Sequence, residues 1–187
     1  MDTDGDSVPD YLDKCPGTPV EAYGFIDENG CPKDTDEDGV PDYSDQCPAL
    51  KGIIENNGCP VVKEAVKKVF EKALQGIQFE TGKAAIKKTS FPVLDQIVTI
   101  MKENPDYMLI INGHTDNVGK PDKNLILSED RAKAVENYLV RGGITPFRLM
   151  AKGYGDTQPL VENTTKENKA KNRRVELIVK FEKFEQE

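Results

Sequence analysis

The sequence predicts a two-layer α/β sandwich with a mixed β-α-β-α-β-β sheet, preceded by a segment that lacks regular secondary structure. Residues 1–60 contain all four cysteines and carry 15 acidic against 3 basic side chains, whereas residues 61–187 carry 18 against 22. In the second part, apolar patterns of helical period alternate with short apolar runs, which is typical of helices packed on a sheet. We therefore expect two domains, at 1–60 and 61–187.

The acidic part is a repeat. The segment DTDGDSVPDYLDKCP at 2–16 returns as DTDEDGVPDYSDQCP at 34–48, and ENGCP at 28–32 returns as NNGCP at 56–60. Self-similarity of this kind indicates a repeat architecture. The two copies span 2–32 and 34–60.

Each copy has the aspartate spacing of a calcium loop. Carboxylates fall at positions 1, 3, 5, 9 and 12 of twelve residues, and a valine at position 7 offers its backbone carbonyl. No amphipathic helix flanks either loop, so an EF-hand is excluded, and the alternative is a solvated acidic linker. The expected calcium ligands are Asp2, Asp4, Asp6, Val8, Asp10 and Asp13, and then Asp34, Asp36, Asp38, Val40, Asp42 and Asp45.

The four cysteines indicate an oxidising compartment, since a small acidic segment with little apolar content needs covalent staples. Three pairings are possible. Repeat symmetry favours Cys15 with Cys31 and Cys47 with Cys59. A zinc site is the alternative, although no C-x-x-C motif is present. Because no signal peptide precedes the repeat, we expect the chain to be a fragment of a longer exported protein.

Two helices and a strand are predicted in the first half of the second part. The first helix spans 61–76, where apolar residues recur at helical spacing until Gly76. A short strand follows at 77–80. The second helix starts after Ser90, which can cap it, and stops at Asn104-Pro105. Its expected buried stripe is Leu94, Ile97, Val98 and Met101.

The second half adds three strands and a helix. The run YMLIIN at 107–112 predicts a strand buried on both faces. A helix is expected at about 122–141, with Ala132, Val135 and Leu139 as its core seam. Strands follow at 148–153 and 174–181. The last one alternates apolar and polar residues, which predicts a half-exposed strand at a sheet edge.

The turn GHTDNVG at 113–119 lies where a ligand is expected, beyond the carboxyl end of a strand. Gly113 and Gly119 allow a tight turn and a close approach to a ligand. Asp116 can accept hydrogen bonds from an ammonium group, and Arg131 on the following helix can bind a carboxylate in a forked geometry. This combination suits a zwitterion. The alternative is that Asp116 pairs with Arg131 or caps the turn.

Several separated motifs give the chain a family resemblance. Residues 77–181 resemble an OmpA-like peptidoglycan-binding domain, through GHTDNVG, LSEDRA at 127–132, GYGDTQP at 153–159 and NRRVEL at 172–177. The first third resembles thrombospondin type 3 repeats, which join such domains to an outer-membrane barrel in some family members. The resemblance implies the periplasmic portion of a Gram-negative outer membrane protein, linked to the membrane only through a missing N-terminal barrel.

The resemblance also implies a ligand and site residues. The family binds the diaminopimelate of peptidoglycan stem peptides without a covalent bond. Asp116 would take its ammonium group and Arg131 its carboxylate. The residues implied to shape the pocket are Thr115, Asn117, Asn124, Glu80 (where the family often has aspartate), Thr81 and Arg174, whereas Arg173 is expected to be solvated.

Three classes of function are compatible with this organisation of the chain. We expect a non-catalytic anchor that binds peptidoglycan through a calcium-stiffened linker, with calcium as the cofactor. A cell-wall enzyme is disfavoured because the chain has one histidine and no nucleophile–base pair at recognisable spacing. A calcium-dependent adhesion module would need aromatic patches, yet aromatic content is 7% and tryptophan is absent. The small basic excess disfavours nucleic acid, and no apolar run is long enough for a membrane helix.

Overall fold

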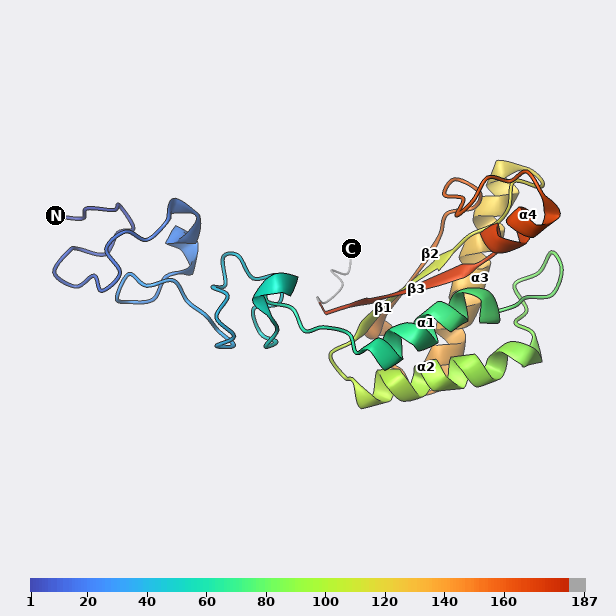
Figure 1. Ribbon diagram of the computed structural model, residues 1–187, viewed down its shortest axis with the longest axis horizontal. Coiled ribbons are helices and arrows are strands. Elements are labelled where there is room, and N and C mark those ends of the chain that lie inside the picture. The colour runs from blue at the N-terminus through green and yellow to red at the C-terminus, as the bar shows by residue number, and fades with distance from the viewer. Residues whose placement is uncertain (182–187) are drawn as a thin grey trace. The chain divides into compact units, whose positions relative to one another are not determined.

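The computed structural model of the chain describes residues 1–181 (Figure 1). Contacts divide the chain into two compact units, one spanning Met1–Val61 and one that begins at Val62. The last six residues of the expected second domain, 182–187, lie outside the described residues. Among residues 1–181, no helix combines the length and the apolar character that crossing a bilayer requires.

The first unit consists of loops with two short 3-10 helices, η1 (Val20–Phe25) and η2 (Ile54–Asn56). Its buried apolar side chains are few, so covalent links must replace a core. Disulfides join Cys15 to Cys31 and Cys47 to Cys59, with Cα atoms 5.1 and 5.0 Å apart. The pairing predicted from repeat symmetry is confirmed. By closing loops of this size, each bridge stabilises the unit by about 3 kcal/mol.

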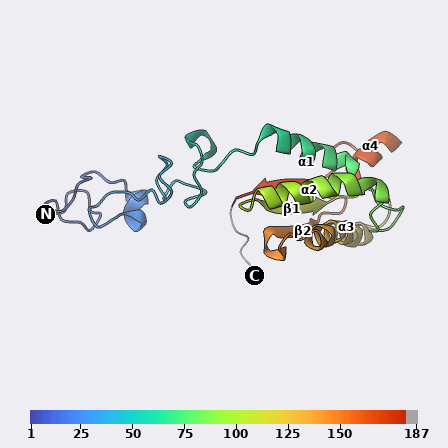
Figure 2. The same ribbon diagram turned by 90° about the horizontal axis from the view of Figure 1, so that it is seen from below.

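The second unit is a two-layer sandwich of helices on a mixed sheet, which confirms the predicted fold class. The sheet has the order β2-β1-β3, with β2 parallel and β3 antiparallel to β1. Figure 2 shows α2 between α1 and α3. The elements in chain order are α1 (Glu64–Gly76), η3 (Lys88–Ser90), α2 (Phe91–Glu103), β1 (Met108–Gly113), α3 (Pro121–Arg141), η4 (Pro146–Arg148), β2 (Leu149–Gly153), α4 (Lys166–Asn172) and β3 (Val175–Lys180).

The core lies between the helices and one face of the sheet. Leu109 and Ile111 of β1 point into it and meet the predicted stripe of α2 and the predicted seam of α3. The other face of the sheet is open. There Ile110 is half-buried between its register neighbours Met150 and Ile178, which are both exposed. The expectation that β1 is buried on both faces is confirmed at all positions but one: Met108 and Asn112 are buried on this face too, and only Ile110 is half-buried, because no helix covers it.

Two local predictions fail for physical reasons. Residues 77–80 form no strand, since only Phe79 makes a bridge, to Ile86. Ser90 precedes α2 as expected, but its hydroxyl accepts a hydrogen bond from the backbone N–H of Gln78 at 2.8 Å instead of capping the helix. The serine thus ties the 77–80 segment to the start of α2.

Helix α4 was not predicted. Its sequence KENKAKN has no apolar stripe, so it carries no periodic signal. It starts because the side chain of Thr165 caps it by accepting a hydrogen bond from the backbone N–H of Asn168 at 3.1 Å. It ends next to Arg173, a residue of the candidate site described below.

Two glycines set how closely α3 approaches the sheet. Gly113 on β1 and Gly153 on β2 are register partners. A Cβ atom on Gly113 would overlap the backbone carbonyl of Ser128, and one on Gly153 would overlap the backbone of Glu129. Gly113 was expected to permit close approach of a ligand. The structure shows that it permits close approach of a helix, which brings α3 against the turn that follows β1.

Candidate functional site

The turn after β1 is fixed by its backbone. The N–H of His114 donates to the carbonyl of Arg174 at 3.0 Å, and the N–H of Thr115 donates to the carbonyl of Gly155 at 2.8 Å. On the other side of the turn, the side-chain amide of Asn124 donates to the backbone carbonyl of Asp116 at 3.2 Å. These bonds reach the next two strands and the first turn of α3. The position of the Asp116 carboxylate is therefore set by the fold.

Asp116 uses its two carboxylate oxygens differently. Oδ1 accepts a hydrogen bond from the backbone N–H of Val118 at 3.0 Å, which closes the turn. Oδ2 lies 2.6 Å from Nη1 of Arg173. The Asp116 side chain is 11% exposed and that of Arg173 is 45% exposed. The acid is thus largely buried, while its partner arginine reaches it from the surface.

Arg131 is buried on α3 and does not pair with Asp116. Its Nε donates to the backbone carbonyl of Lys83 at 3.2 Å, and its guanidinium lies over the ring of Phe79, 5.1 Å from the centroid. Burial, and next the nearby guanidinium of Arg173, lowers the pKa of Arg131, against the opposite effect of Asp116. The surroundings of this cation therefore favour an added negative charge.

Arg131 and Arg173 line a common cavity of about 540 Å³. Thr81 contributes to the same wall, and Leu74, Ile77 and Phe79 provide apolar surface. A cavity of this size suits a ligand of a few residues. Asp116 is joined to it through the ion pair with Arg173.

The structure brings together only part of the expected site. Asn124 is buried against the turn, and Thr115 is buried with a hydroxyl that has no hydrogen-bond partner among residues 1–181. Asn117 is exposed at the turn, where its N–H faces the side chain of Asn163 at 3.4 Å. Glu80 is exposed and does not line the cavity, although its neighbour Thr81 does.

The two consecutive arginines lie on opposite sides of the sheet. Arg174, expected to line the groove, bonds Glu176 with Nε at 2.8 Å and Nη2 at 2.6 Å. Arg173, expected to be solvated, is the partner of Asp116. The alternation of β3 contains the signal that was missed: Val175 points into the core, and a residue two positions earlier points the same way.

His114 lies next to Arg174, on the side of the sheet that no helix covers. Its ring is 1% exposed, stacks on Tyr154 with centroids 5.4 Å apart, and has Nε2 3.6 Å from an oxygen of Glu176. Burial lowers the pKa of His114, the charge of Arg174 lowers it further, and Glu176 opposes both. The histidine is therefore neutral near pH 7 and packs as part of the wall behind the turn.

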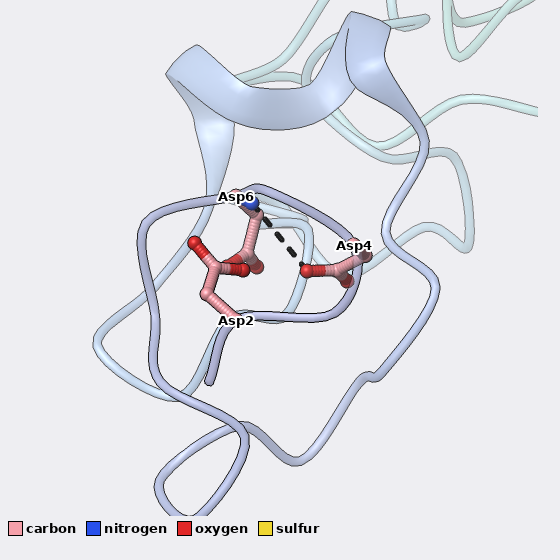
Figure 3. Close-up of side chains that lie close together, drawn as sticks. All are labelled: Asp2, Asp4 and Asp6. Atoms are coloured by element: carbon pink, nitrogen blue, oxygen red, sulfur yellow. Dashed lines mark hydrogen bonds between the residues drawn. The ribbon is translucent and has the colours of Figure 1, made fainter.

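Both acidic loops gather three carboxylates. Asp2, Asp4 and Asp6 point toward one another in the first loop (Figure 3), and Asp34, Asp36 and Asp38 do so in the second; within each set, one oxygen per residue lies within 4.8 Å of the others. The backbone N–H groups of Val8 and Val40 donate to the third acid of each set, at 2.7 and 2.8 Å.

The remaining expected ligands serve the loop itself. Both oxygens of Asp10 accept hydrogen bonds from the backbone and hydroxyl of Thr3, and those of Asp42 do the same for Thr35. Asp13 and Asp45 each accept from the backbone N–H of the cysteine two residues on, at 2.7 and 2.6 Å. Their carboxylates press against Gly30 and Gly58, where a Cβ atom would overlap them. This contact explains why the glycine of ENGCP returns in NNGCP.

Comparison with known proteins identifies the family. The model of the OmpA family matches residues 78–173, slightly more than half of the chain. The chain belongs to the OmpA family. The thrombospondin type 3 repeat model matches residues 1–22 and 27–51. Both matches agree with the resemblances found in the sequence.

Three relatives illustrate the range of OmpA-family proteins to which the chain is similar. Outer membrane porin F of Pseudomonas aeruginosa is 38% identical over 182 residues, covering 97% of this chain and 42% of the porin. The peptidoglycan-binding protein ArfA of Mycobacterium tuberculosis is 38% identical over 103 residues, covering 55% of this chain and 32% of ArfA. The crystal structure of the peptidoglycan-associated lipoprotein from Burkholderia pseudomallei superposes with a TM-score of 0.54 at 25% identity, covering 60% of this chain and 93% of that one. The chain thus spans less than half the length of these two curated relatives.

Proposed function

We propose that this OmpA-family chain binds peptidoglycan non-covalently, through the diaminopimelate residue of its stem peptides, and performs no catalysis. The observation that carries the proposal is that the buried, fold-fixed carboxylate of Asp116 is ion-paired with Arg173, which lines one cavity together with the buried guanidinium of Arg131. Asp116 offers an oxygen to an ammonium group, and Arg131 offers donors to a carboxylate. The free end of diaminopimelate carries both groups on one carbon.

Arg131 is suited to receive that carboxylate. Among residues 1–181, the only hydrogen bond from its guanidinium is the one from Nε to Lys83. Its terminal nitrogens therefore remain available for a planar, bidentate contact. The ring of Phe79 fixes the plane of the guanidinium and limits its motion.

Reversible binding fits this geometry. The ligand ammonium must share Asp116 with Arg173, whose half-exposed side chain can move toward solvent. Ligand binding thus exchanges one partner of an existing, partly exposed ion pair and does not create a new pair in a sealed interior. The ligand should therefore bind with modest affinity and be released rapidly. Both properties suit an anchor that holds a wall polymer and lets it go during growth. Relatives named as outer membrane and peptidoglycan-binding proteins support the periplasm as the proposed location of such an anchor.

We also propose that the first unit is stiffened by calcium. Calcium takes oxygen ligands, and the unit offers two convergent sets of three carboxylates. The side chain of Asp6 is 3% exposed and its Oδ2 has no partner among residues 1–181, and Oδ2 of Asp36 is buried and unpaired as well. Unpaired buried carboxylate oxygens are costly without a cation. The residues present therefore fit the ion, and would hold it through Asp2, Asp4 and Asp6 and through Asp34, Asp36 and Asp38.

Sedimentation with purified sacculi of the diaminopimelate type tests the proposed binding. The wild-type chain should pellet with the sacculi, and Asp116→Asn should stay in the supernatant. Asp122→Asn is the matched control, because it removes an exposed acid from the first turn of α3, outside the cavity. A wild-type chain that stays soluble, or an Asp116→Asn variant that pellets equally well, would refute the proposal.

A further inference from the structure

The cavity at the candidate site holds more positive charge than a single zwitterion needs. Four cationic side chains line it: Lys87 just before η3, Arg131 on α3, Lys171 on α4 and Arg173 after α4. In the described part of the chain, residues 1–181, no acidic residue lines this cavity. The nearby carboxylate of Asp116 is already paired with Arg173. The charge of the lining therefore favours a ligand that carries several negative charges.

Neither lysine has an ion-pair partner among residues 1–181. Across residues 1–181, no carboxylate lies within ion-pair distance of the ammonium group of Lys87 or Lys171; the ion pairs found in that range are Lys51–Glu37, His114–Glu176, Lys133–Glu136, Arg173–Asp116 and Arg174–Glu176. Lys87 is held in place by its backbone, whose N–H donates to the carbonyl of Gln78 at 2.8 Å. The ammonium groups of Lys87 and Lys171 therefore belong to the cavity lining without a carboxylate partner among residues 1–181.

We propose that Lys87 and Lys171 bind further free carboxylates of the stem peptide, so that the site discriminates it from the amidated form. This inference rests on the proposed function and deepens it. A stem peptide with a γ-linked glutamate and a terminal residue carries carboxylates in addition to the one beside the diaminopimelate ammonium. Asp116 takes that ammonium group, Arg131 takes the carboxylate beside it, and the two lysines take the others. Amidation of one of these further carboxylates removes its negative charge, so the lysine that would bind it has no anionic partner.

The position of the two lysines suits them to discriminate between similar stem peptides, and not to provide the main binding contacts. Both lie outside the GHTDNVG and LSEDRA motifs, on the rim formed by the 81–87 segment and α4. Lys171 is exposed and Lys87 is half-buried, so water screens each contact. Screened contacts of this kind change affinity by roughly two- to fivefold each, because exposed ion pairs contribute at most about 1 kcal/mol. The lysines would thus adjust the affinity of a site whose main ligand contacts are made by Asp116 and Arg131.

Calorimetric titration of the tripeptide L-Ala-γ-D-Glu-meso-diaminopimelate tests the inference. One form has all carboxyl groups free, and the other has them amidated except for the one beside the free diaminopimelate ammonium, which is assigned to Arg131. The proteins are the wild type, Lys87→Gln, Lys171→Gln and the double variant. Matched controls are Lys88→Gln and Lys166→Gln, which remove exposed lysines in η3 and on α4 that do not line the cavity. Lys87→Gln and Lys171→Gln should each weaken binding of the free peptide by roughly two- to fivefold, leave the amidated peptide unchanged and, together, abolish the preference.

Three outcomes are decisive against the inference. If the double variant keeps the wild-type preference, the lysines do not read carboxylates, and the inference fails while the proposed function stands. If the control lysines reduce the preference equally, the effect is general electrostatic attraction and not site recognition, which also overturns it. If the wild type binds neither peptide, or Asp116→Asn binds like the wild type, the proposed function fails and takes the inference with it.

Discussion

Nη1 of Arg173 lies 2.6 Å from Oδ2 of Asp116 and forms an ion pair with that carboxylate. The other oxygen of Asp116 closes its own turn through Val118. One acid thus has a structural oxygen and an exchangeable one. Because the two oxygens have different partners, replacing Arg173 and replacing Asp116 should have different effects.

Replacing Arg173 should affect stability less than truncating Asp116. Arg173→Gln removes a half-exposed partner, so the free energy of unfolding should change by less than about 1 kcal/mol. Asp116→Ala also removes the acceptor for Val118, and should cost about 1–2 kcal/mol. Urea unfolding of the second unit measures both, and Asp116→Asn is the control because its amide oxygen can still accept from Val118. Equal losses in all three variants would show that the two oxygens do not divide these tasks.

Gly113→Ala should destabilise the second unit by about 1–3 kcal/mol or more, because the added methyl group would overlap the backbone of Ser128 and push α3 from the sheet. The control is Gly76→Ala at the end of α1. A Cβ atom there would meet its nearest neighbour, a methyl group of Val93, at 3.5 Å, an ordinary contact. That variant should be neutral or slightly stabilising. Thermal unfolding distinguishes them, and an unchanged melting temperature for Gly113→Ala would contradict the close packing of α3.

His114 should make the second unit less stable as the pH falls below about 6.5, the pKa of an unfolded histidine. Its pKa in the folded state is lowered by burial and by Arg174, against Glu176, so the unfolded chain takes up the proton first. The unfolding free energy then decreases with falling pH until the folded pKa is reached, by at most about 1.4 kcal/mol per pH unit.

The measurement is denaturant unfolding of the wild type and His114→Gln at several pH values between 5 and 7. The variant should show a shallower slope, since Arg174, Glu176 and Tyr154, which face the ring, are retained in both proteins. Identical slopes would show that the buried imidazole does not control this dependence.

Chelation of divalent cations should loosen residues 1–61 and leave the second unit folded. Without a cation, the three converging carboxylates of each acidic loop repel one another. The disulfides close residues 15–31 and 47–59, which follow the acidic loops and do not enclose them. Limited proteolysis with and without chelator, followed by mass analysis of the fragments, should show new cuts confined to the first unit. Cutting that is equal under both conditions would argue against calcium.

Sequence periodicity predicted most of the fold because the core follows it closely. The seam of α3 and the stripe of α2 are buried where helical spacing placed them, and β3 alternates as expected. The prediction of secondary structure failed in segments whose apolar residues show no periodicity. Helix α4 has none, and the four residues of IQFE are too few to distinguish a strand from the single bridge that Phe79 makes.

The site could be predicted only in part, for a geometric reason. Asp116 follows the end of a recognisable strand and Arg131 lies within the recognisable helix that comes next, so their neighbourhood follows from topology. Arg173 and Arg174 are adjacent in sequence, and which of them faces Asp116 depends on where the alternation of β3 begins. Extending the alternation back from Val175 would have selected Arg173. The cluster of four cations depends on α4 and therefore could not be foreseen.

Calorimetric titration of a diaminopimelate-containing muropeptide into the wild type, Asp116→Asn and Arg131→Gln, with the melting temperature of each protein, tests the central claim most directly. The account predicts binding by the wild type and a loss of roughly tenfold or more in each variant, with little change in the melting temperature of Asp116→Asn. Absence of binding by the wild type, or equal binding by all three proteins, would contradict it and leave Asp116 and Arg131 with structural roles alone.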